Sequence, residues 1–418
     1  MSEKVTRRDF VKGGTAATAA FLSSVPLAYA GGQDPTITVG LIGCGGRGTG
    51  AAENCLESSP NVQLVAMGDM FKDRLDGSRR SLSKREGYKV TDDHVFVGFD
   101  AHKKVLETGV NMVILATPPG FRPYHFKAAI EAGKHVFFEK PVGVDPTGIR
   151  IVMEYGKIAK EKKLAVVTGT QRRHQKSYME CIQRIHDGAM GDVVAGRAYW
   201  NGGSPWVNPR KPGQSDMEYQ LRNWYYYAWL CGDHIVEQHV HNLDVMNWVL
   251  KGHPVSAVAV GGRQVRTGPE FGHAYDHFGV DYTYANDVHV LSMCRHWANC
   301  PGNVSEAIVG TKGRSNCNSS IDGHDGKNLW KFGGGGINPY VQEHKDLIAS
   351  IREGKPLNEA QQIAESTLTA IMGREAAYTG QVIKWDEFLK SPLNLMPENL
   401  SLDAKLPEPP VPIPGRKA

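Results

Sequence analysis

The feature that most constrains the fold of this chain is a glycine-rich loop, Gly43-Cys44-Gly45-Gly46-Arg47-Gly48, placed between a strand-like apolar run and a helix-like segment. In a G-x-G-x-x-G loop the first glycine permits a tight turn, the second lets the backbone approach a pyrophosphate, and the third allows close packing of the helix on the strand. Free amide groups at the start of the helix then face the anion. The loop therefore predicts a Rossmann domain that contacts a dinucleotide through Gly43, Gly45, Gly46, Arg47 and Gly48.

An acidic residue stands where such a domain binds the ribose of its cofactor. A second strand is expected at residues 62–67, and Asp69 follows it, about 20 residues after the loop. A carboxylate at this position accepts a hydrogen bond from the 2′-hydroxyl of NAD and repels the 2′-phosphate of NADP. We therefore predict NAD, although basic residues that follow leave NADP possible: Lys72, Arg74, Arg79 and Arg80.

The pattern of the sequence divides the chain into two domains. Over residues 31–168, strand-like and helix-like segments alternate as they do in a parallel α/β sheet. Two of the strands are expected to end at Thr117-Pro118 and at Glu139-Lys140. Because ligands of open α/β sheets lie beyond the carboxyl ends of the strands, these residues should border the cofactor cleft.

Residues 169–390 have a different pattern. Strand-like alternation between residues 192 and 294 predicts an α+β domain. A helix at about residues 359–379 is expected to pack back against the first domain, and residues 391–418 form a proline-rich, extended tail.

Residues 1–30 are predicted to be an export signal. Arg7 and Arg8 precede a mild apolar stretch that ends in Ala28-Tyr29-Ala30, the pattern of a twin-arginine signal cleaved after Ala30. We therefore expect a periplasmic protein that meets the twin-arginine translocase during export. That route carries folded proteins, so the cofactor should be bound tightly before export and retained. The stretch is too short and too polar to span a bilayer, so stable membrane insertion is not expected.

Composition and motifs argue against a nucleic-acid partner, a disulfide framework and a metal site. The net charge of +4 is small for 418 residues and the two signs are interspersed, which predicts no nucleic-acid partner. Seven cysteines without a C-x-x-C pair indicate free thiols rather than a disulfide framework. Histidines and carboxylates crowd residues 233–241, but the H-E-x-x-H pattern is absent, so no metal site is predicted.

Three further motifs accompany the glycine loop: Ala116-Thr117-Pro118-Pro119 with His125, Glu139-Lys140-Pro141, and Glu237-Gln238-His239-Val240-His241-Asn242-Leu243-Asp244. In this order and spacing the chain resembles the Gfo/Idh/MocA oxidoreductases, the family of glucose–fructose oxidoreductase and inositol dehydrogenase. The resemblance covers most of the chain after residue 30. It implies a Rossmann domain joined to a substrate domain with a large open-faced, mainly antiparallel sheet, a nicotinamide dinucleotide, and a sugar or polyol substrate. Members commonly associate through the open sheet, so a homo-oligomer is expected.

The resemblance also implies roles for the reacting groups. In the family the lysine of Glu-Lys-Pro reaches the substrate and tunes the proton-accepting histidine, a role that falls to Lys140. The segment from Glu237 to Asp244 carries the general base. On a helix, Glu237 and His241 share one face, with Asp244 one turn further. A histidine between carboxylates is made more basic, so His241 is expected to be the base and Glu237 its neighbour.

Four residues are candidates for contacts with the substrate. Arg173 follows the strand at residues 164–168, where the resemblance places substrate residues, although a salt-bridging arginine fits equally well. Trp224 belongs to an aromatic cluster that offers flat faces to a sugar ring or packs in the core, and Tyr178 is open to the same two interpretations. His239 stands where family members often have a small residue.

Three functions are compatible with these motifs. The leading hypothesis is an oxidoreductase that moves hydride between a sugar or polyol hydroxyl and a nicotinamide cofactor. In the second, transient oxidation acidifies a C–H bond, an aglycone is eliminated and the oxidation is reversed, which makes a glycoside hydrolase or lyase with no net redox change. The third is a non-catalytic sugar-binding protein, against which the intact Lys140 and His241 argue.

Overall fold

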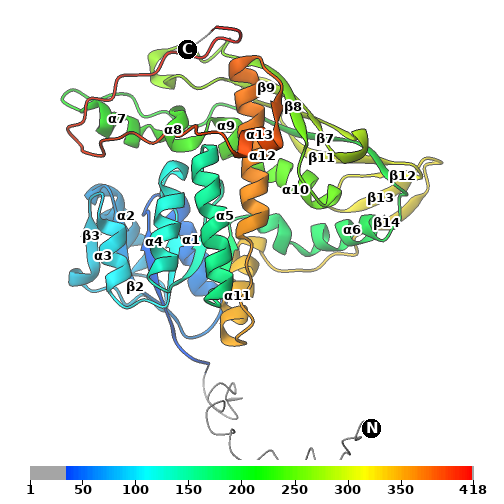
Figure 1. Ribbon diagram of the computed structural model, residues 1–418. Coiled ribbons are helices and arrows are strands. Elements are labelled where there is room, and N and C mark those ends of the chain that lie inside the picture. Colours follow the sequence, from blue (N-terminus) through cyan, green and yellow to red (C-terminus); the bar gives the residue numbers. More distant parts are fainter. Residues whose placement is uncertain (1–33, 417–418) are drawn as a thin grey trace, which may run out of the picture. The chain divides into compact units, whose positions relative to one another are not determined.

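The computed structural model describes residues 34–416, whose helices and strands are shown in Figure 1. The predicted export signal and its cleavage point after Ala30 lie outside the described residues. The first domain contains a six-stranded, fully parallel sheet in the order β3-β2-β1-β4-β5-β6. Its strands are β1 (Ile37–Ile42), β2 (Val62–Asp69), β3 (Val95–Val97), β4 (Met112–Leu115), β5 (His135–Phe138) and β6 (Val166–Thr168).

Helices flank this sheet because its central strands are apolar on both faces. Every residue of β4 is buried, and in β5 only His135 is partly exposed. Such strands are typical of a parallel sheet covered on both sides. The covering helices are α1 (Gly46–Ser58), α2 (Lys72–Leu82), α3 (Ala101–Glu107), α4 (Arg122–Glu131) and α5 (Pro146–Glu161), with the short turns η1 (Asp92–His94) and η2 (Pro119–Phe121).

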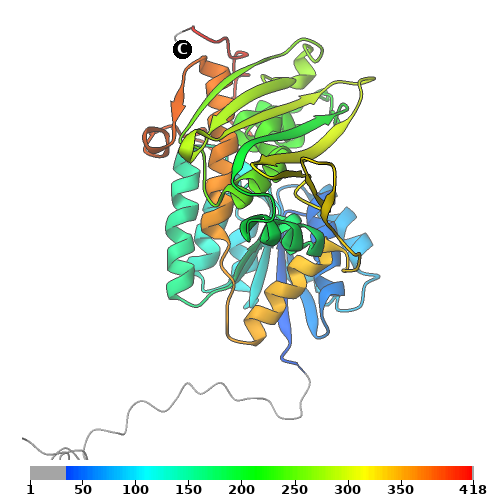
Figure 2. The same cartoon turned by 90° about the vertical axis from the view of Figure 1, so that its right-hand side faces the viewer.

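The second domain contains a nine-stranded sheet in the order β14-β13-β12-β11-β7-β10-β9-β8-β15. Neighbouring strands are antiparallel except β7 and β10, so the sheet is mainly antiparallel, as expected. Burial alternates along β10: Val290 and Cys294 are buried, whereas Leu291 and Met293 are exposed. Figure 2 shows the strands of this sheet side by side in the upper part of the view. The strands are β7 (Val193–Gly202), β8 (Ser256–Gly262), β9 (His277–Thr283), β10 (His289–His296), β11 (Asn303–Gly310), β12 (Gly313–Ser315), β13 (Ser320–Gly323), β14 (Asn328–Lys331) and β15 (Ile383–Lys384).

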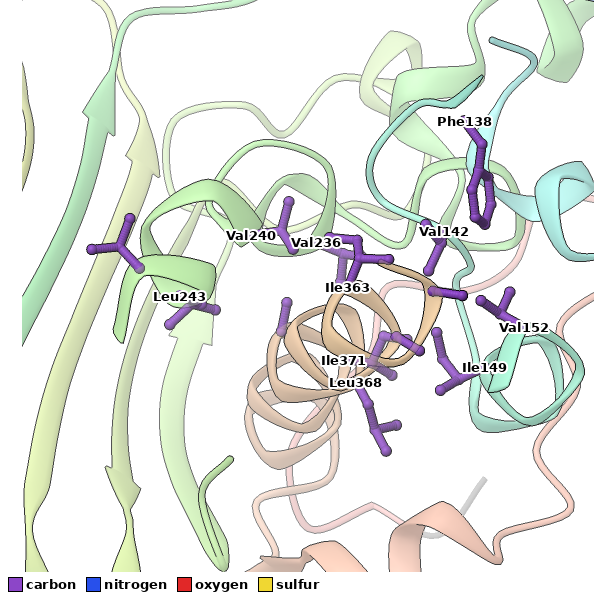
Figure 3. Packing of buried hydrophobic residues seen from close by; sticks show 14 of the residues in the cluster. Phe138, Val142, Ile149, Val152, Val236, Val240, Leu243, Ile363, Leu368 and Ile371 are labelled. Carbon is purple, nitrogen blue, oxygen red and sulfur yellow. The ribbon is translucent and has the colours of Figure 1, made fainter. Parts of the chain in front are cut away.

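Two long C-terminal helices return to the first domain, whereas the sequence predicted one. In α12 (Ala360–Thr379), Ile363, Leu368 and Ile371 pack among apolar side chains of α5 and of the second domain, as Figure 3 shows. The other helix, α11 (Pro339–Arg352), buries Leu347 and Ile348 in the apolar cluster of β1 and β4.

The remaining helices of this domain are short. They are α6 (Lys176–His186), α7 (Asp216–Arg222), α8 (Ala228–Cys231), α9 (His234–Glu237), α10 (Val240–Leu250) and α13 (Trp385–Leu389), with the turns η3 (Gln171–His174), η4 (Trp224–Tyr226), η5 (Pro269–Phe271) and η6 (Ala285–Asp287). Residues 391–416 contain turns but neither helix nor strand. Between residues 34 and 416, no helix is both long and apolar enough to cross a bilayer.

Candidate active site

A cavity of about 790 Å³ lies where the carboxyl ends of the parallel strands meet the second domain. Every residue that the sequence predicted to contact the cofactor lines it: Gly43, Gly45, Gly46, Arg47, Gly48, Asp69, Thr117, Pro118, His125, Glu139 and Lys140. From the second domain, Trp224, Glu237 and His241 line the same cavity. The lysine and the histidine, 101 positions apart in the sequence, therefore face one space.

The glycine loop leaves room for a ligand at its centre. A Cβ atom at Gly45 or Gly46 would meet no other heavy atom within 4 Å, so the backbone there is open to the cavity. A Cβ at Gly48 would lie 1.9 Å from the Gly43 carbonyl oxygen, so this position requires glycine. Gly43 itself has φ +98°, which favours glycine as well. The loop has the shape that a pyrophosphate needs.

Asp69 is fixed at the end of β2 by two backbone amides. The Cys44 N–H donates to Asp69 Oδ2 at 2.6 Å, and the Phe71 N–H donates to Oδ1 at 2.8 Å. Burial raises the pKa of Asp69, an effect that these two hydrogen bonds oppose. Of the four basic residues that follow, only Arg74 lines the cavity, whereas Lys72 pairs with Asp76 at 2.6 Å. The site thus fits the ribose of NAD.

Lys140 and Glu237 form a buried pair between the domains. The Lys140 ammonium donates to the Glu237 backbone carbonyl at 2.6 Å and to its Oε1 at 3.3 Å. The other carboxylate oxygen, Oε2, is buried without a hydrogen-bond partner among residues 34–416. Burial raises the pKa of Glu237, and the positive charges of Lys140 and Arg122 oppose the rise.

His241 lies beside this pair with its ring nitrogens open. No group among the described residues 34–416 hydrogen-bonds the ring, and the indole of Trp200 is stacked on it with ring centres 5.9 Å apart. Burial lowers the pKa of His241 well below its usual value, and the positive charges of Lys140, Arg172 and Arg47 lower it further. The expectation that carboxylates make His241 more basic is therefore wrong. The ring is neutral near pH 7 and can accept a proton.

The single helix expected over residues 237–244 is also interrupted. Glu237 ends α9, and His241 is the second residue of α10. In a continuous helix the Glu237 carbonyl would accept from the His241 amide, but here it accepts from Lys140, and the His241 amide donates to the Gln238 carbonyl at 3.4 Å. Asp244 does not orient His241, because its carboxylate binds Arg173 at 2.9 Å.

Three of the four predicted substrate residues lie away from the cavity lining. Arg173 is tied to Asp244, Tyr178 donates to Glu306 at 3.0 Å, and the His239 ring contacts the Ser292 hydroxyl at 2.7 Å. Each fills a buried polar contact instead, so the prediction that these three contact the substrate is corrected. Only Trp224 reaches the cavity.

Several further residues line the cavity that the sequence did not predict. Arg172, rather than Arg173, faces it from η3, with Trp200, Tyr225 and Gln238 from the second domain. Arg122 holds two backbone segments that border the cavity. It donates to the carbonyls of Thr117 and Pro141, each at 2.7 Å. Which of two consecutive arginines faces inward depends on the short turn η3, for which the sequence carries no periodic signal.

Together the glycine loop, the cleft at the strand ends and the second domain define a two-domain protein of the dinucleotide-binding class. A model described as "Oxidoreductase family, NAD-binding Rossmann fold" matches residues 37–170, and one described as "GFO/IDH/MocA C-terminal domain" matches residues 178–315. The chain therefore belongs to the Gfo/Idh/MocA oxidoreductase family. Within residues 34–416, no group of three or more His, Cys, Asp or Glu residues is arranged to hold a metal ion.

Curated relatives carry the names of inositol dehydrogenases. Inositol 2-dehydrogenase 4 of Saccharopolyspora erythraea is 29% identical over 226 residues, which are 54% of this chain and 56% of that protein. An inositol 2-dehydrogenase of Gluconacetobacter diazotrophicus is 25% identical over 334 residues, 77% of this chain and 88% of that protein. The chain thus spans little more than half the length of the first of these relatives.

Solved structures share the fold at low identity. Scyllo-inositol dehydrogenase from Lactobacillus casei, solved with NAD(H) and scyllo-inositol, has a TM-score of 0.64 and 19% identity, over 84% of this chain and 99% of that chain. The aldose–aldose oxidoreductase from Caulobacter crescentus has a TM-score of 0.65 and 18% identity, over 84% and 100%. At these identities the likeness shows the fold alone.

Proposed function

We propose that this protein is an NAD-dependent oxidoreductase that transfers hydride between a CH–OH group of a sugar or polyol and its cofactor. The observation that carries this proposal is that Lys140, Glu237 and His241 line one cavity with the glycine loop and Asp69. The names of the curated relatives, all inositol dehydrogenases among those described above, favour a polyol oxidation over the glycosidase and sugar-binding alternatives.

In this reaction the chain supplies a general base, His241, a hydrogen-bond donor, Lys140, and a carboxylate that binds the donor, Glu237. NAD, when bound, supplies the acceptor for the hydride. His241 is neutral and open, so it takes the proton from the substrate hydroxyl. Two of the three N–H groups of the Lys140 ammonium bind Glu237, and the third remains for the substrate oxygen. Lys140 thus stabilises the negative charge that develops on that oxygen.

The experiment is a screen of purified protein for polyol-dependent reduction of NAD. Inositols, aldoses and aldonic acids are supplied in turn, and reduced nicotinamide is followed by its absorbance. We expect one of these compounds to drive reduction, and His241→Asn to abolish it while the protein still binds NAD. Turnover of an aryl glycoside without accumulation of reduced nicotinamide would instead favour the elimination reaction.

Two features of the cellular context are part of the same proposal. The paired arginines Arg7 and Arg8 support export through the twin-arginine route to the periplasm, with the cofactor already bound. Identification of the mature N-terminus and of the compartment in fractionated cells tests this. Residue 31 as the first residue, in the periplasmic fraction, is the expected result.

We also propose a homo-oligomer that forms through the open face of the nine-stranded sheet. Exposed apolar side chains gather there on neighbouring strands: Val258 and Val260 of β8, and Leu291 and Met293 of β10. Register places them on one face, because Asp281 and Gly279 of β9 pair with both sets. Asp281 lies between the two pairs, so the apolar side chains form two groups on one face, and exposed apolar groups of this kind are typical of a protein interface.

A further inference from the structure

One wall of the cavity belongs to none of the family motifs. It is formed by residues 203–226, which run from the end of β7 through α7 to η4 and which we call the strap. Six strap residues line the cavity: Trp206, Asn208, Leu221, Arg222, Trp224 and Tyr225. The first domain contributes Asp69, Phe71, Arg74, Phe99 and His102 to the same space. The strap therefore faces the side of the cleft on which a Rossmann domain binds the adenosine ribose.

An ion pair clasps the strap to the first domain. The Arg222 guanidinium binds both oxygens of Asp73, at 3.1 Å each, and lies over the ring of Phe71 with 3.9 Å to the ring centre. Asp73 is in the first turn of α2, four residues after Asp69. Bidentate geometry and the aromatic face make this contact stronger than an ordinary surface pair. It lies at the wall of the cavity next to the predicted ribose site.

Hydrogen bonds and apolar contacts outside the cavity hold the strap in place. The Asn208 side chain donates to the Arg222 carbonyl at 2.7 Å, and Gln220 donates to the Leu406 carbonyl of the C-terminal tail at 2.8 Å. Buried Met217, Leu221 and Tyr226 form a third apolar cluster, against which Phe71, Phe99 and Phe121 of the first domain pack. Opening the strap therefore exposes apolar surface as well as breaking the clasp.

The far end of the strap reaches the reacting groups. Tyr225 lines the cavity together with Glu237, and its hydroxyl contacts Nε2 of His296 at 2.9 Å. The strap thus extends along the cleft from Asp73 to the neighbourhood of Glu237.

From this geometry we propose that the strap is part of the cofactor site: it closes over the adenosine half of the dinucleotide and retains it as a non-exchanging group. The inference rests on the proposed function, since it requires a dinucleotide in the cleft. A nucleotide held in this way leaves only when Arg222 separates from Asp73. Each oxidation must then be followed by a reduction in the same pocket, so in the polyol screen reduction should stop at one NADH per protein molecule unless a second substrate takes the hydride.

The test measures how fast the cofactor leaves, independently of turnover. Purified protein is loaded with NADH, excess NAD is added, and the loss of protein-bound NADH fluorescence is followed. We expect wild-type protein to release NADH slowly and to keep nucleotide through gel filtration. Arg222→Ala and Asp73→Asn, which break the clasp from its two sides, should each release it roughly tenfold faster.

A matched control lies on the strap itself. Arg210 pairs with Asp216 at 2.6 Å, both within the strap, and does not line the cavity, so Arg210→Ala should leave the release rate unchanged. Equal release from wild type and both clasp variants would overturn the proposal, as would fast exchange from the wild type. Failure of the wild type to bind any dinucleotide would overturn the proposed function instead, so the two failures are distinguishable.

Discussion

The imidazole of His241 is the residue on which the proposed proton transfer depends. Replacement with asparagine keeps a similar size but removes the basic nitrogen, so kcat should fall by roughly 10²- to 10⁴-fold. NAD binding should be unchanged, because the replacement keeps the size of the side chain and leaves the glycine loop and Asp69 as they are. Steady-state kinetics and a fluorescence titration with NADH separate the two effects, and a loss of affinity with unchanged kcat would contradict the assignment.

Lys140 sets the charge environment of that base. Its ammonium is among the groups that hold the pKa of His241 low, second only to burial. In Lys140→Met the pKa of His241 should rise, so the acidic limb of the kcat/KM profile should move to higher pH as overall activity falls. A profile that keeps its position would show that another group titrates. Lys104→Met, on the exposed side of α3, is the control and should leave the profile unchanged.

At the scale of residues, the sequence predicted the positions that depend on local backbone structure better than the direction in which individual side chains point. Gly48 and Asp69 follow from the requirements of a turn and a strand end, which are local. The choice of Arg172 over Arg173, and the burial of His239 against Ser292, depend on packing between distant segments. The low pKa of His241 likewise depends on Lys140 and Arg172, which tertiary structure brings near.

At the scale of elements, the contact between α5 and α12 joins the two domains. A Cβ at Gly156 of α5 would lie 2.6 Å from the Cβ of Ala360, the first residue of α12. Gly156→Ala should therefore lower the free energy of unfolding by about 1–3 kcal/mol, since the helices must move apart. Gly77→Ala, in α2 with its nearest neighbour 3.9 Å away, should instead raise it by about 0.5–1 kcal/mol. Urea unfolding of both variants makes the comparison, and equal effects would contradict the contact.

The break between α9 and α10 marks the limit of prediction for elements. Residues 234–250 have helix-compatible residues throughout, so a continuous helix is the natural expectation. At the interruption the Glu237 carbonyl accepts from Lys140, a residue of the other domain, and not from the His241 amide. Lys140 therefore contacts the segment that carries His241. By contrast, strands such as β4 and β5 were predictable because their apolar runs are local.

At the scale of the whole molecule, His174 links three segments of the chain. Its ring contacts Asp346 of α11 at 2.7 Å and lies 3.1 Å from Glu359, which precedes α12. Burial alone would lower the pKa of His174, but these two carboxylates outweigh it and raise the pKa to about 10. The stabilisation is complete below the unfolded pKa of about 6.5 and is lost as pH rises through about 10.

Stability should therefore fall between about pH 6.5 and pH 10, and His174→Gln should flatten that part of the curve. The measurement is the free energy of unfolding in urea at several pH values for both proteins. An unchanged slope in the variant would show that His174 is neutral in the folded protein. His174, Asp346 and Glu359 lie in three different segments, so this stability depends on contacts between distant parts of the chain.

The open face of the nine-stranded sheet is the proposed interface between subunits. A lysine in place of Val260 or Leu291 puts a charge into the apolar patch, whose burial in an interface would then carry a large desolvation cost. Each substitution should shift sedimentation from oligomer to monomer while leaving the fold and NADH release unchanged. Val265→Lys, at an exposed valine beyond the end of β8, is the control and should remain oligomeric. Because the patch and the cleft lie on different sides of the second sheet, a monomeric variant that keeps its cofactor would separate assembly from catalysis. A wild-type protein that sediments as a monomer would remove the interface altogether.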